Sequence, residues 1–424
     1  MRTARAWAGS ASGLAGAWIA VLATLLPSIV GPLARAQDRP PPARAAVLPD
    51  AAALLAAATW EVREVGLGLE LRRAWLAKLG PGPQSLCVLL LDPALGADTT
   101  VAVPRGLRPT TVQARDAEAI IAWNGGFFLP NGRPRGLRRG GGVELSPAGE
   151  TAVATVGWRG AEWRFGTSRD DWSEFPEVVE AGPRLLADGG VVDHGAKQRS
   201  IRHPRTALGV RADGVVVVLT ADGRTPLAAG LSLEELAEVM QALGCRDAIN
   251  LDGGGSTTLW AAALEDRDAG RSGIANRPCD NKRYDERGER AVADVVLVHG
   301  RRTVVVDDDE LEIAQGRLRR DDDGTGQLGR TFATAPSGET VLAAFRLRVP
   351  SAGRYAIQRR SVLAPGLVDA AASWAGGNAV SSDAPGGWYT VAERPLAAGE
   401  FVVEVASVPG RPLAVDAVRL LSLD

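Results

Sequence analysis

Alternating apolar and polar positions run through most of the chain and predict many short strands. Residues 60–75 (WEVREVGLGLELRRAW) alternate charged and apolar side chains, which predicts one or two strands. Residues 85–91 (SLCVLLL) form a continuous apolar run that indicates a buried strand, and Cys87 within it is expected to be a core residue. Two β-rich runs in residues 206–220 flank Ala212-Asp213-Gly214, so this segment predicts a hairpin.

Helical periodicity is clearest in residues 231–243. Ser232 is placed to cap this helix, and Glu235 three residues later completes a capping box. Gly244 is expected to end the helix. A shorter helical period in residues 111–122 runs into an apolar strand, and residues 51–58 suit the start of a short helix. One face of the 231–243 helix is apolar: Leu233, Leu236, Ala237, Met240 and Leu243.

These patterns divide the chain into two folded domains. Residues 59–302 are expected to form an α+β domain, mostly β-sheet with a few helices. The composition changes after residue 299, and residues 303–424 are expected to form an all-β sandwich. The acidic clusters at 307–309 and 321–323 suit solvated loops, with a Ca²⁺ site as the alternative. The strands of the sandwich are expected at 341–349, 354–360, 388–391, 401–405 and 414–421.

The first residues carry an export pattern. Arg2 and Arg5 precede an uncharged apolar stretch, and Ala34-Arg35-Ala36 matches the small-x-small pattern of a signal peptidase site. We therefore expect residues 1–36 to be a cleaved signal peptide and the protein to be secreted or periplasmic, with an uncleaved membrane anchor as the alternative. Residues 37–58 are rich in Pro and Ala and suit a linker.

Composition narrows the functional classes. The chain has 424 residues and a formal net charge of −2, so a nucleic-acid partner bound through bulk positive charge is not expected. With three Cys the chain has no disulfide framework, and we expect that Cys245 and Cys279 do not form an essential disulfide. Three His leave little room for a His-rich zinc site, and HExxH, GxSxG and P-loop motifs are absent.

Candidate chemistry is densest in residues 248–258 (AINLDGGGSTT). A short strand delivers Asp252 to its end, and three glycines then let the backbone approach a ligand closely. Consecutive N–H groups in such a turn suit an anion, with the hydroxyls of Ser256 and Thr257 as further donors. A carboxylate beside an anion-binding loop makes sense if it acts on an adjacent electrophilic carbon. Polar residues also cluster near other strand ends, in residues 124–128, 202–206, 221–224 and 276–278, and the last cluster is followed by Glu289-Arg290.

Taken in order, these segments resemble the phosphodiester glycosidase family. The matching pieces are AWNGGFF (122–128), VVEAGPRLLADG (178–189), RHPRTALGV (202–210), ADGR (221–224), the helix with NLDGGGST (230–260), and NRP with ERAVADVVLV. The resemblance covers about residues 60–300. This chain departs from the family pattern with Cys245, where a small residue is usual, and with a charged loop over residues 264–274.

The resemblance implies hydrolysis of a glycosidic bond whose leaving group is a phosphate ester. Asp252 is then the nucleophile or base, and Asp222 the second carboxylate. No cofactor is expected to be required, although a divalent cation is possible. The alternatives are a metal-dependent phosphodiesterase that cleaves P–O and a non-catalytic glycan-binding protein. The residues expected to contact sugar or phosphate are Asn124, Arg205, Thr206, Arg224, Asn250, Gly253, Gly254, Gly255, Ser256, Thr257 and Asn276.

The C-terminal segment resembles the golvesin-like β-sandwich domain. The supporting pieces are VVVDDD (304–309), RVPSAGRYAIQ (348–358), GGWYTV (386–391) and VDAVRLL (415–421). This resemblance implies contact with a glycan or a cell surface, or a stabilising accessory role.

Overall fold

The computed structural model describes residues 48, 50–193, 201–266, 268–322, 331–360, 371–374, 377–380, 387–408 and 412–423. The predicted signal peptide and most of the predicted linker lie outside these residues. Helix α1 (Ala51–Ala56) forms near the end of that linker, and Leu48, Ala51 and Leu55 pack into the core there. Within the described residues, no helix has the length and apolar character needed to cross a bilayer.

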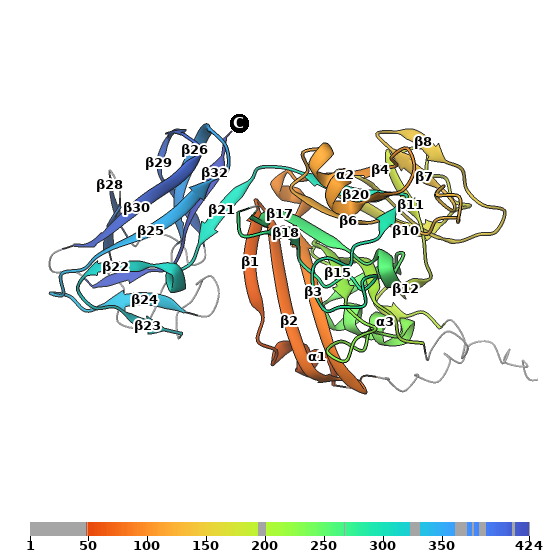
Figure 1. Cartoon of the computed structure of the whole chain (residues 1–424), viewed down its shortest axis with the longest axis horizontal. Helices are drawn as coiled ribbons and strands as arrows, with labels where there is room; N and C mark the ends of the chain where they lie inside the picture. Colours follow the sequence, from red (N-terminus) through yellow and green to blue (C-terminus); the bar gives the residue numbers. More distant parts are fainter. Residues whose placement is uncertain are drawn as a thin grey trace, which may run out of the picture. The chain divides into compact units, whose positions relative to one another are not determined.

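The N-terminal part of the fold is built around one long antiparallel sheet. Its strands lie in the order β1-β2-β3-β15-β14-β16-β12-β13, and most of them are visible in Figure 1. The bounds of these strands are β1 Glu61–Gly66, β2 Leu69–Leu79, β3 Gly82–Leu91, β12 Arg184–Ala187, β13 Gly190–Val191, β14 Arg205–Arg211, β15 Val216–Ala221 and β16 Cys245–Asn250.

Both faces of this sheet are buried, which explains the continuous apolar run in β3. Successive side chains of a strand point to opposite faces. Cys87 and Leu89 therefore pack on one face against the other sheets, while Leu86 and Val88 pack on the opposite face beneath the helices. Cys87 is a core residue, as expected.

Two five-stranded sheets within the described residues cover the first face. One has the order β18-β17-β6-β20-β4 and the other β10-β9-β11-β7-β8. Trp123 of β6 and Trp158 of β9 are fully buried in the core that they share with the long sheet. The bounds are β4 Asp98–Ala102, β6 Ile121–Asn124, β7 Arg138–Gly140, β8 Val143–Ser146, β9 Ala154–Arg159, β10 Glu162–Thr167, β11 Glu177–Glu180, β17 Leu259–Asp266, β18 Arg271–Ile274 and β20 Val295–His299, with the small pair β5 Arg108–Pro109 and β19 Ala291–Val292.

Helix α3 (Leu233–Ala242) covers the second face of the long sheet together with α1. The predicted capping box is confirmed, because Glu235 N–H donates to Ser232 Oγ at 3.2 Å and Ser232 N–H donates to Glu235 Oε2 at 2.9 Å. Gly244 follows the helix with a left-handed φ of 86°, as a helix stop requires. The shorter helix α2 (Thr110–Asp116) leads into β6, also as expected.

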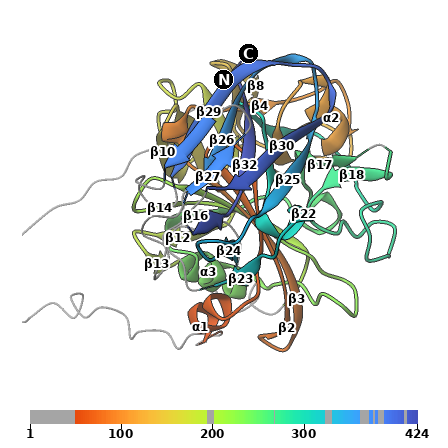
Figure 2. The same ribbon diagram turned by 90° about the vertical axis from the view of Figure 1, so that its left-hand side faces the viewer.

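The chain changes sheets close to residue 302. Strand β20 pairs with β6 and β4, whereas β21 pairs with β32 in a separate set of antiparallel sheets. These sheets have the orders β21-β32-β26-β29, β22-β25-β30-β27-β28 and β23-β24-β31 and share a core around Phe345 (Figures 1 and 2). The bounds are β21 Thr303–Val306, β22 Glu312–Gln315, β23 Arg319–Asp321, β24 Phe332–Ala335, β25 Leu342–Val349, β26 Gly353–Arg360, β27 Ala371–Trp374, β28 Gly377–Val380, β29 Trp388–Leu396, β30 Gly399–Ser407, β31 Leu413–Val415 and β32 Val418–Ser422.

Candidate active site

The long sheet gathers the candidate residues at one end. Leu86 of β3 pairs with Ala221 of β15, and Ala221 pairs with Arg205 of β14. On the other side of β14, Ala207 pairs with Asn250 of β16. Neighbouring strands are antiparallel. The N-terminal ends of β3 and β14 and the C-terminal ends of β15 and β16 therefore share this edge. The ADGR, HPRT and NLDGGG segments therefore meet there.

Asp252 lies in the loop directly after β16. Gly253 N–H donates to its Oδ1 at 2.8 Å, and its own N–H donates to Gly125 O at 3.1 Å. Burial raises the pKa of Asp252 above its usual range, and nearby Asp294 acts in the same direction. Arg290 opposes both effects. A carboxyl group with a raised pKa is a better proton acceptor near neutral pH.

Neighbouring side chains lie so close to the glycine loop that a Cβ atom would collide with them or nearly so. A Cβ on Gly254, which has a φ of 64°, would lie 3.0 Å from Arg224 Nη2. A Cβ on Gly255 would lie 1.9 Å from Asp280 Oδ1, so no larger residue fits there without a shift. Asp280 is itself held by Arg290 at 2.7 and 2.8 Å. The loop is thus enclosed by charged side chains.

The predicted hydroxyl donors Ser256 and Thr257 are almost fully buried. Ser256 lies beside the Asp252 carboxyl group, and Thr257 Oγ1 has no hydrogen-bond partner among the described residues. Gly253 is partly exposed, and Gly254 N–H donates to Pro204 O at 2.8 Å. Of the loop residues that we predicted to bind phosphate, only Gly253, next to the candidate nucleophile or base Asp252, is therefore partly exposed.

Four other predicted substrate ligands form a buried network behind the loop. Asn124 Nδ2 donates to Asp252 O at 2.7 Å, and Thr206 Oγ1 donates to Asn124 Oδ1 at 2.8 Å. Asn250 Nδ2 donates to Gly182 O and Leu251 O, and Asn276 Nδ2 donates to Thr257 O. These four side chains are at most 2% exposed. Their contacts favour a role in positioning the loop, and direct contact with substrate stays a prediction.

Asp222 is also buried, at 1% exposure, and its oxygens are fully engaged. Ser85 Oγ donates to Oδ2 at 2.6 Å, while Arg277 N–H and Asn276 Nδ2 donate to Oδ1 at 2.8 and 3.1 Å. Burial raises the pKa of Asp222 to about 6 despite these bonds. The carboxyl group connects β3, β15 and the 276–277 segment, so its geometry is that of a positioning residue.

Two predicted arginines remain available to an anion. Arg205 donates to the carbonyls of Leu231 and Ile201, at 2.9 and 3.1 Å, and Arg224 donates to His203 Nδ1 at 3.2 Å. Neither has a carboxylate partner among the described residues. Burial and the charge of Arg224 lower the pKa of Arg205 to about 10. Electrostatic repulsion between the two guanidinium groups thus contributes to the shift.

Two contributors to this site, Asp280 and Asp294, were not singled out from the sequence. Asp280 encloses Gly255 together with Arg290, which belongs to the polar pair Glu289-Arg290 noted in the sequence. Asp294 accepts from Gly126 N–H at 2.9 Å and from Arg138 Nε at 2.7 Å, which anchors the turn that contacts Asp252. A carboxylate inside an apolar strand run (ERAVADVVLV) was the available signal for Asp294.

Acidic groups that suit a cation meet outside this site. Carboxylate oxygens of Asp307, Asp308 and Asp416 lie within 4.8 Å of one another in the C-terminal sheets. Burial raises the pKa of Asp307 to about 7, and Arg320 and Arg360 form ion pairs with Asp308 and Asp416 at 3.2 and 3.5 Å. The Ca²⁺ interpretation of this cluster stays a prediction.

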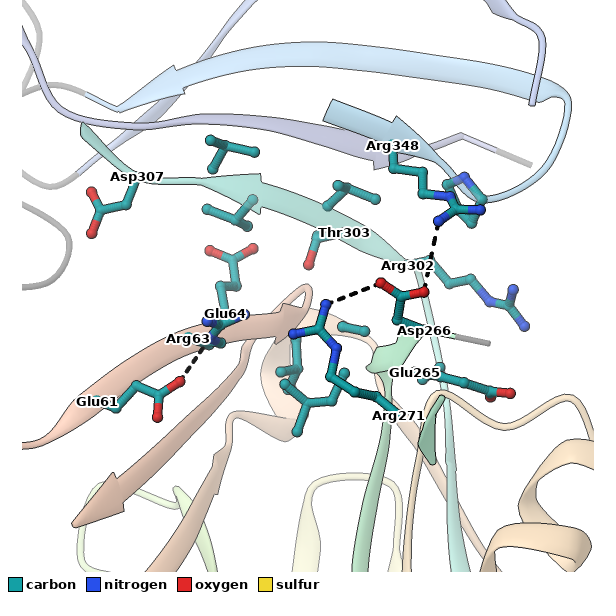
Figure 3. Close-up of a pocket in the computed structure, with 18 of the residues that line it drawn as sticks. Glu61, Arg63, Glu64, Glu265, Asp266, Arg271, Arg302, Thr303, Asp307 and Arg348 are labelled. Carbon is teal, nitrogen blue, oxygen red and sulfur yellow. Dashed lines mark hydrogen bonds and ion pairs between the residues drawn. The ribbon is translucent and has the colours of Figure 1, made fainter. Parts of the chain in front are cut away.

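A cavity of about 1040 Å³ also lies away from the glycine loop. Its wall is charged, and Asp266 there pairs with Arg271 at 3.0 Å and with Arg348 at 3.8 Å (Figure 3). Its described lining includes none of the predicted site residues. The candidate residues at the sheet edge therefore lie outside this cavity.

Comparison with known proteins agrees with the motifs at that edge. Residues 117–299 match the family model for phosphodiester glycosidases. These residues form a phosphodiester glycosidase domain. The match includes the glycine loop, both predicted catalytic carboxylates and both unpaired arginines. It begins at residue 117, so strands β1 to β5 and helix α2 precede it.

Two curated proteins are similar to parts of the chain. A prophage-derived uncharacterised protein of Bacillus subtilis, YomE, is 40% identical over 159 residues, which is 34% of this chain and 24% of that protein. N-acetylglucosamine-1-phosphodiester alpha-N-acetylglucosaminidase of Bos taurus is 30% identical over 221 residues, which is 45% of this chain and 39% of the bovine protein. The chain thus spans well under half the length of these relatives.

Among solved structures, the catalytic domain of the zebrafish N-acetylglucosamine-1-phosphodiester alpha-N-acetylglucosaminidase, auto-inhibited by its pro-peptide, is 21% identical with a TM-score of 0.45. The alignment covers 57% of this chain and 88% of that one. A hypothetical protein from Synechocystis aligns with a TM-score of 0.47 at 17% identity, over 57% of this chain and 64% of that one.

Proposed function

We propose that this protein hydrolyses the glycosidic bond of a sugar-1-phosphodiester and releases a sugar and a phosphomonoester. One observation carries the proposal. Two arginines without carboxylate partners among the described residues, Arg205 and Arg224, lie beside the glycine loop that follows β16 and begins at Asp252. The arginines suit an anion, and the carboxyl group at the loop suits the adjacent anomeric carbon. The domain's family and the name of the bovine relative support this reading.

The phosphate is assigned to Arg205 and Arg224, because the N–H groups of Asp252, Gly253 and Gly254 already donate within the protein. A phosphodiester carries one negative charge, and guanidinium groups offer it paired N–H donors in a fixed plane. Because Arg224 is exposed and Arg205 partly exposed, both are accessible to a ligand from solvent. A phosphate leaving group needs little protonation, so stabilising its charge matters more than a strong general acid.

Asp252 is assigned to the anomeric carbon, as nucleophile or as base. In the base mechanism, water adds its hydroxyl to that carbon and its proton passes to the Asp252 carboxylate. The bond between carbon and the bridging oxygen breaks, and its electron pair stays on the phosphate. In the nucleophile mechanism, Asp252 Oδ forms the new bond first and water then hydrolyses the glycosyl ester. The anomeric configuration of the first sugar released, read by NMR, distinguishes the two.

The test is a screen of the mature protein on sugar-1-phosphodiesters in ¹⁸O-labelled water, with and without EDTA. Cleavage of the glycosidic bond places ¹⁸O in the sugar, whereas cleavage of P–O places it in the phosphate. Label in the phosphate together with loss of activity in EDTA would establish a metal-dependent phosphodiesterase instead. Absence of turnover on every diester, with sugar binding retained, would establish a glycan-binding protein.

We further propose that the protein is exported and that its C-terminal sandwich contacts a polysaccharide or cell surface. The export pattern at residues 1–36 supports the first proposal. N-terminal sequencing of secreted material should find Gln37 first, and an intact Met1 would reject cleavage. Pull-down of the chain by cell-wall polysaccharide, compared with a chain ending at Arg302, tests the second.

A further inference from the structure

His203 is tied to the loop that carries Arg224. His203 N–H donates to Leu231 O at 3.2 Å, and Leu231 N–H donates to His203 O at 3.1 Å. The backbone of Gly230, which has a φ of 81°, lies so close that a Cβ there would be 2.6 Å from His203 O. The backbone of His203 is therefore held by the 230–231 segment, and the contact with Arg224 orients its ring.

Contact with Arg224 decides which ring nitrogen of His203 carries the proton. Arg224 Nη2 lies 3.2 Å from His203 Nδ1. A guanidinium group has N–H donors and no acceptor, and it stays protonated in proteins. His203 Nδ1 must then be the acceptor, so the ring proton is on Nε2. The partly exposed ring therefore offers an N–H donor on the side opposite Arg224.

The charges around this ring favour its neutral form. Arg205 on β14 and Arg224 on the loop after β15 face it, and Cys279 Sγ contacts Arg224 at 3.9 Å. Burial, Arg205 and Arg224 lower the pKa of His203, and no carboxylate bonds to it among the described residues. The two arginines supply the positive charge for an anion bound here. The neutral His203 ring would add a hydrogen bond to that anion without adding further charge.

We propose that His203 is a neutral hydrogen-bond donor of the phosphate subsite, held in its Nε2–H form by Arg224. This inference rests on the proposed function and names a residue that the sequence analysis did not assign. When the bond to the anomeric carbon breaks, the bound phosphate gains a negative charge, and a bond from Nε2–H to its oxygen strengthens. His203 transfers no proton in this step, because its neutral ring is far too weak an acid.

The tautomer is measured without any substrate. The chain has only three histidines, so ¹⁵N NMR of labelled protein resolves their rings, and His203→Gln identifies the His203 signals by their loss. We expect the shifts of an unprotonated Nδ1 and a protonated Nε2, with a midpoint of titration below 6.5. Arg224→Ala should release the ring into a mixture of tautomers. A ring protonated at Nδ1 at pH 7, or one that is cationic there, would overturn the proposal.

Binding is tested with inorganic phosphate as a competitive inhibitor and by direct titration. His203→Phe keeps a ring but removes the donor, and should weaken phosphate binding about tenfold while lowering kcat/KM for a sugar-1-phosphodiester by more. His203→Gln, whose amide reaches the position of Nε2, should stay within about threefold of wild type. His299→Phe, at a strand end of β20, is the matched control and should change neither.

The two proposals fail in different ways. Wild-type phosphate binding in a folded His203→Phe protein, together with normal turnover, would reject the role of His203 and leave the glycosidase intact. Phosphate binding that depends on His203, without turnover on any glycosyl phosphodiester, would retain the subsite and reject the proposed reaction. If His203→Phe fails to fold, the tautomer of the wild type and the behaviour of His203→Gln decide the question.

Discussion

At the scale of single residues, two carboxyl groups near one sheet edge have different surroundings. Asp222 receives three hydrogen bonds and is 1% exposed, whereas Asp252 is partly exposed at the end of a strand. Burial raises the pKa of both. Replacement by Asn therefore separates a structural role from a chemical one.

Asp252→Asn should abolish turnover while leaving the fold intact. The change keeps the shape of the side chain and removes its charge, so kcat should fall by about three orders of magnitude or more. Arg205→Lys keeps a charge but loses the planar fork, so it should raise KM as well as lower kcat. Steady-state kinetics and thermal melting check both variants. Near-wild-type turnover in folded Asp252→Asn would transfer the role to Asp222.

Asp222→Asn should change stability in a pH-dependent way. The folded pKa of Asp222, about 6, lies above the unfolded value near 3.8, so the native state holds this proton more tightly. Its favourable contribution is present below about pH 3.8 and is lost as the pH rises through about 6. Asn mimics the protonated form, so the variant should match wild type at pH 4 and be more stable at pH 8, by up to about 3 kcal/mol.

Denaturant unfolding at both pH values measures this difference, and exposed Asp213→Asn in the hairpin turn is the control. A variant that is less stable than wild type at pH 8 would mean that the three donors need a charged acceptor. A folded Asp222→Asn protein with a large loss of kcat would show a catalytic role beyond positioning.

At the scale of elements, helix α3 depends on a cap that can be removed by itself. Ser232 and Glu235 exchange two hydrogen bonds, and Arg202 pairs with Glu235 Oε1 at 2.6 Å. The cap thus connects the helix to the segment that leads into His203 and β14.

Ser232→Ala should destabilise the protein by about 1 kcal/mol, because the backbone N–H of Glu235 at the helix start loses its acceptor, Ser232 Oγ. Thermal melting should show a drop of a few degrees. Ser337→Ala, on an exposed loop, is the control and should melt as wild type does. An unchanged melting temperature in Ser232→Ala would mean that packing of the apolar face alone holds the helix start.

At the scale of the whole molecule, the change of sheets near residue 302 predicts two separable domains. Strand β20 completes the sheet of β6 and β4, and β21 pairs only with β32 among the described strands. A chain ending at Arg302 should therefore fold and keep turnover on a small soluble substrate. Circular dichroism and kinetics check this expectation. Loss of cooperative unfolding in the shortened chain would show that the C-terminal sheets complete the core.

Local patterns were sufficient wherever neighbouring residues dictate structure. The hairpin of β14 and β15 followed from two β-rich runs around an Asp-Gly turn, and α3 from its cap and its apolar face. Short polar strands were missed: β7 and β8 (Arg138–Gly140 and Val143–Ser146) carry little apolar periodicity, and their pairing with one another and with β11 comes from the tertiary fold.

The amino-acid sequence by itself determined the sheet-rich class, the capped helix, the change of composition near residue 300 and the glycine loop behind Asp252. Only the tertiary structure decided what each polar side chain faces. It buried Asn124, Asn250 and Asp222 behind the loop, left Arg205 and Arg224 without carboxylate partners among the described residues, and brought His203 to Arg224. The physical reason is range: a cap or a turn is decided within about four residues, whereas burial and charge pairing depend on strands that meet across the sheet.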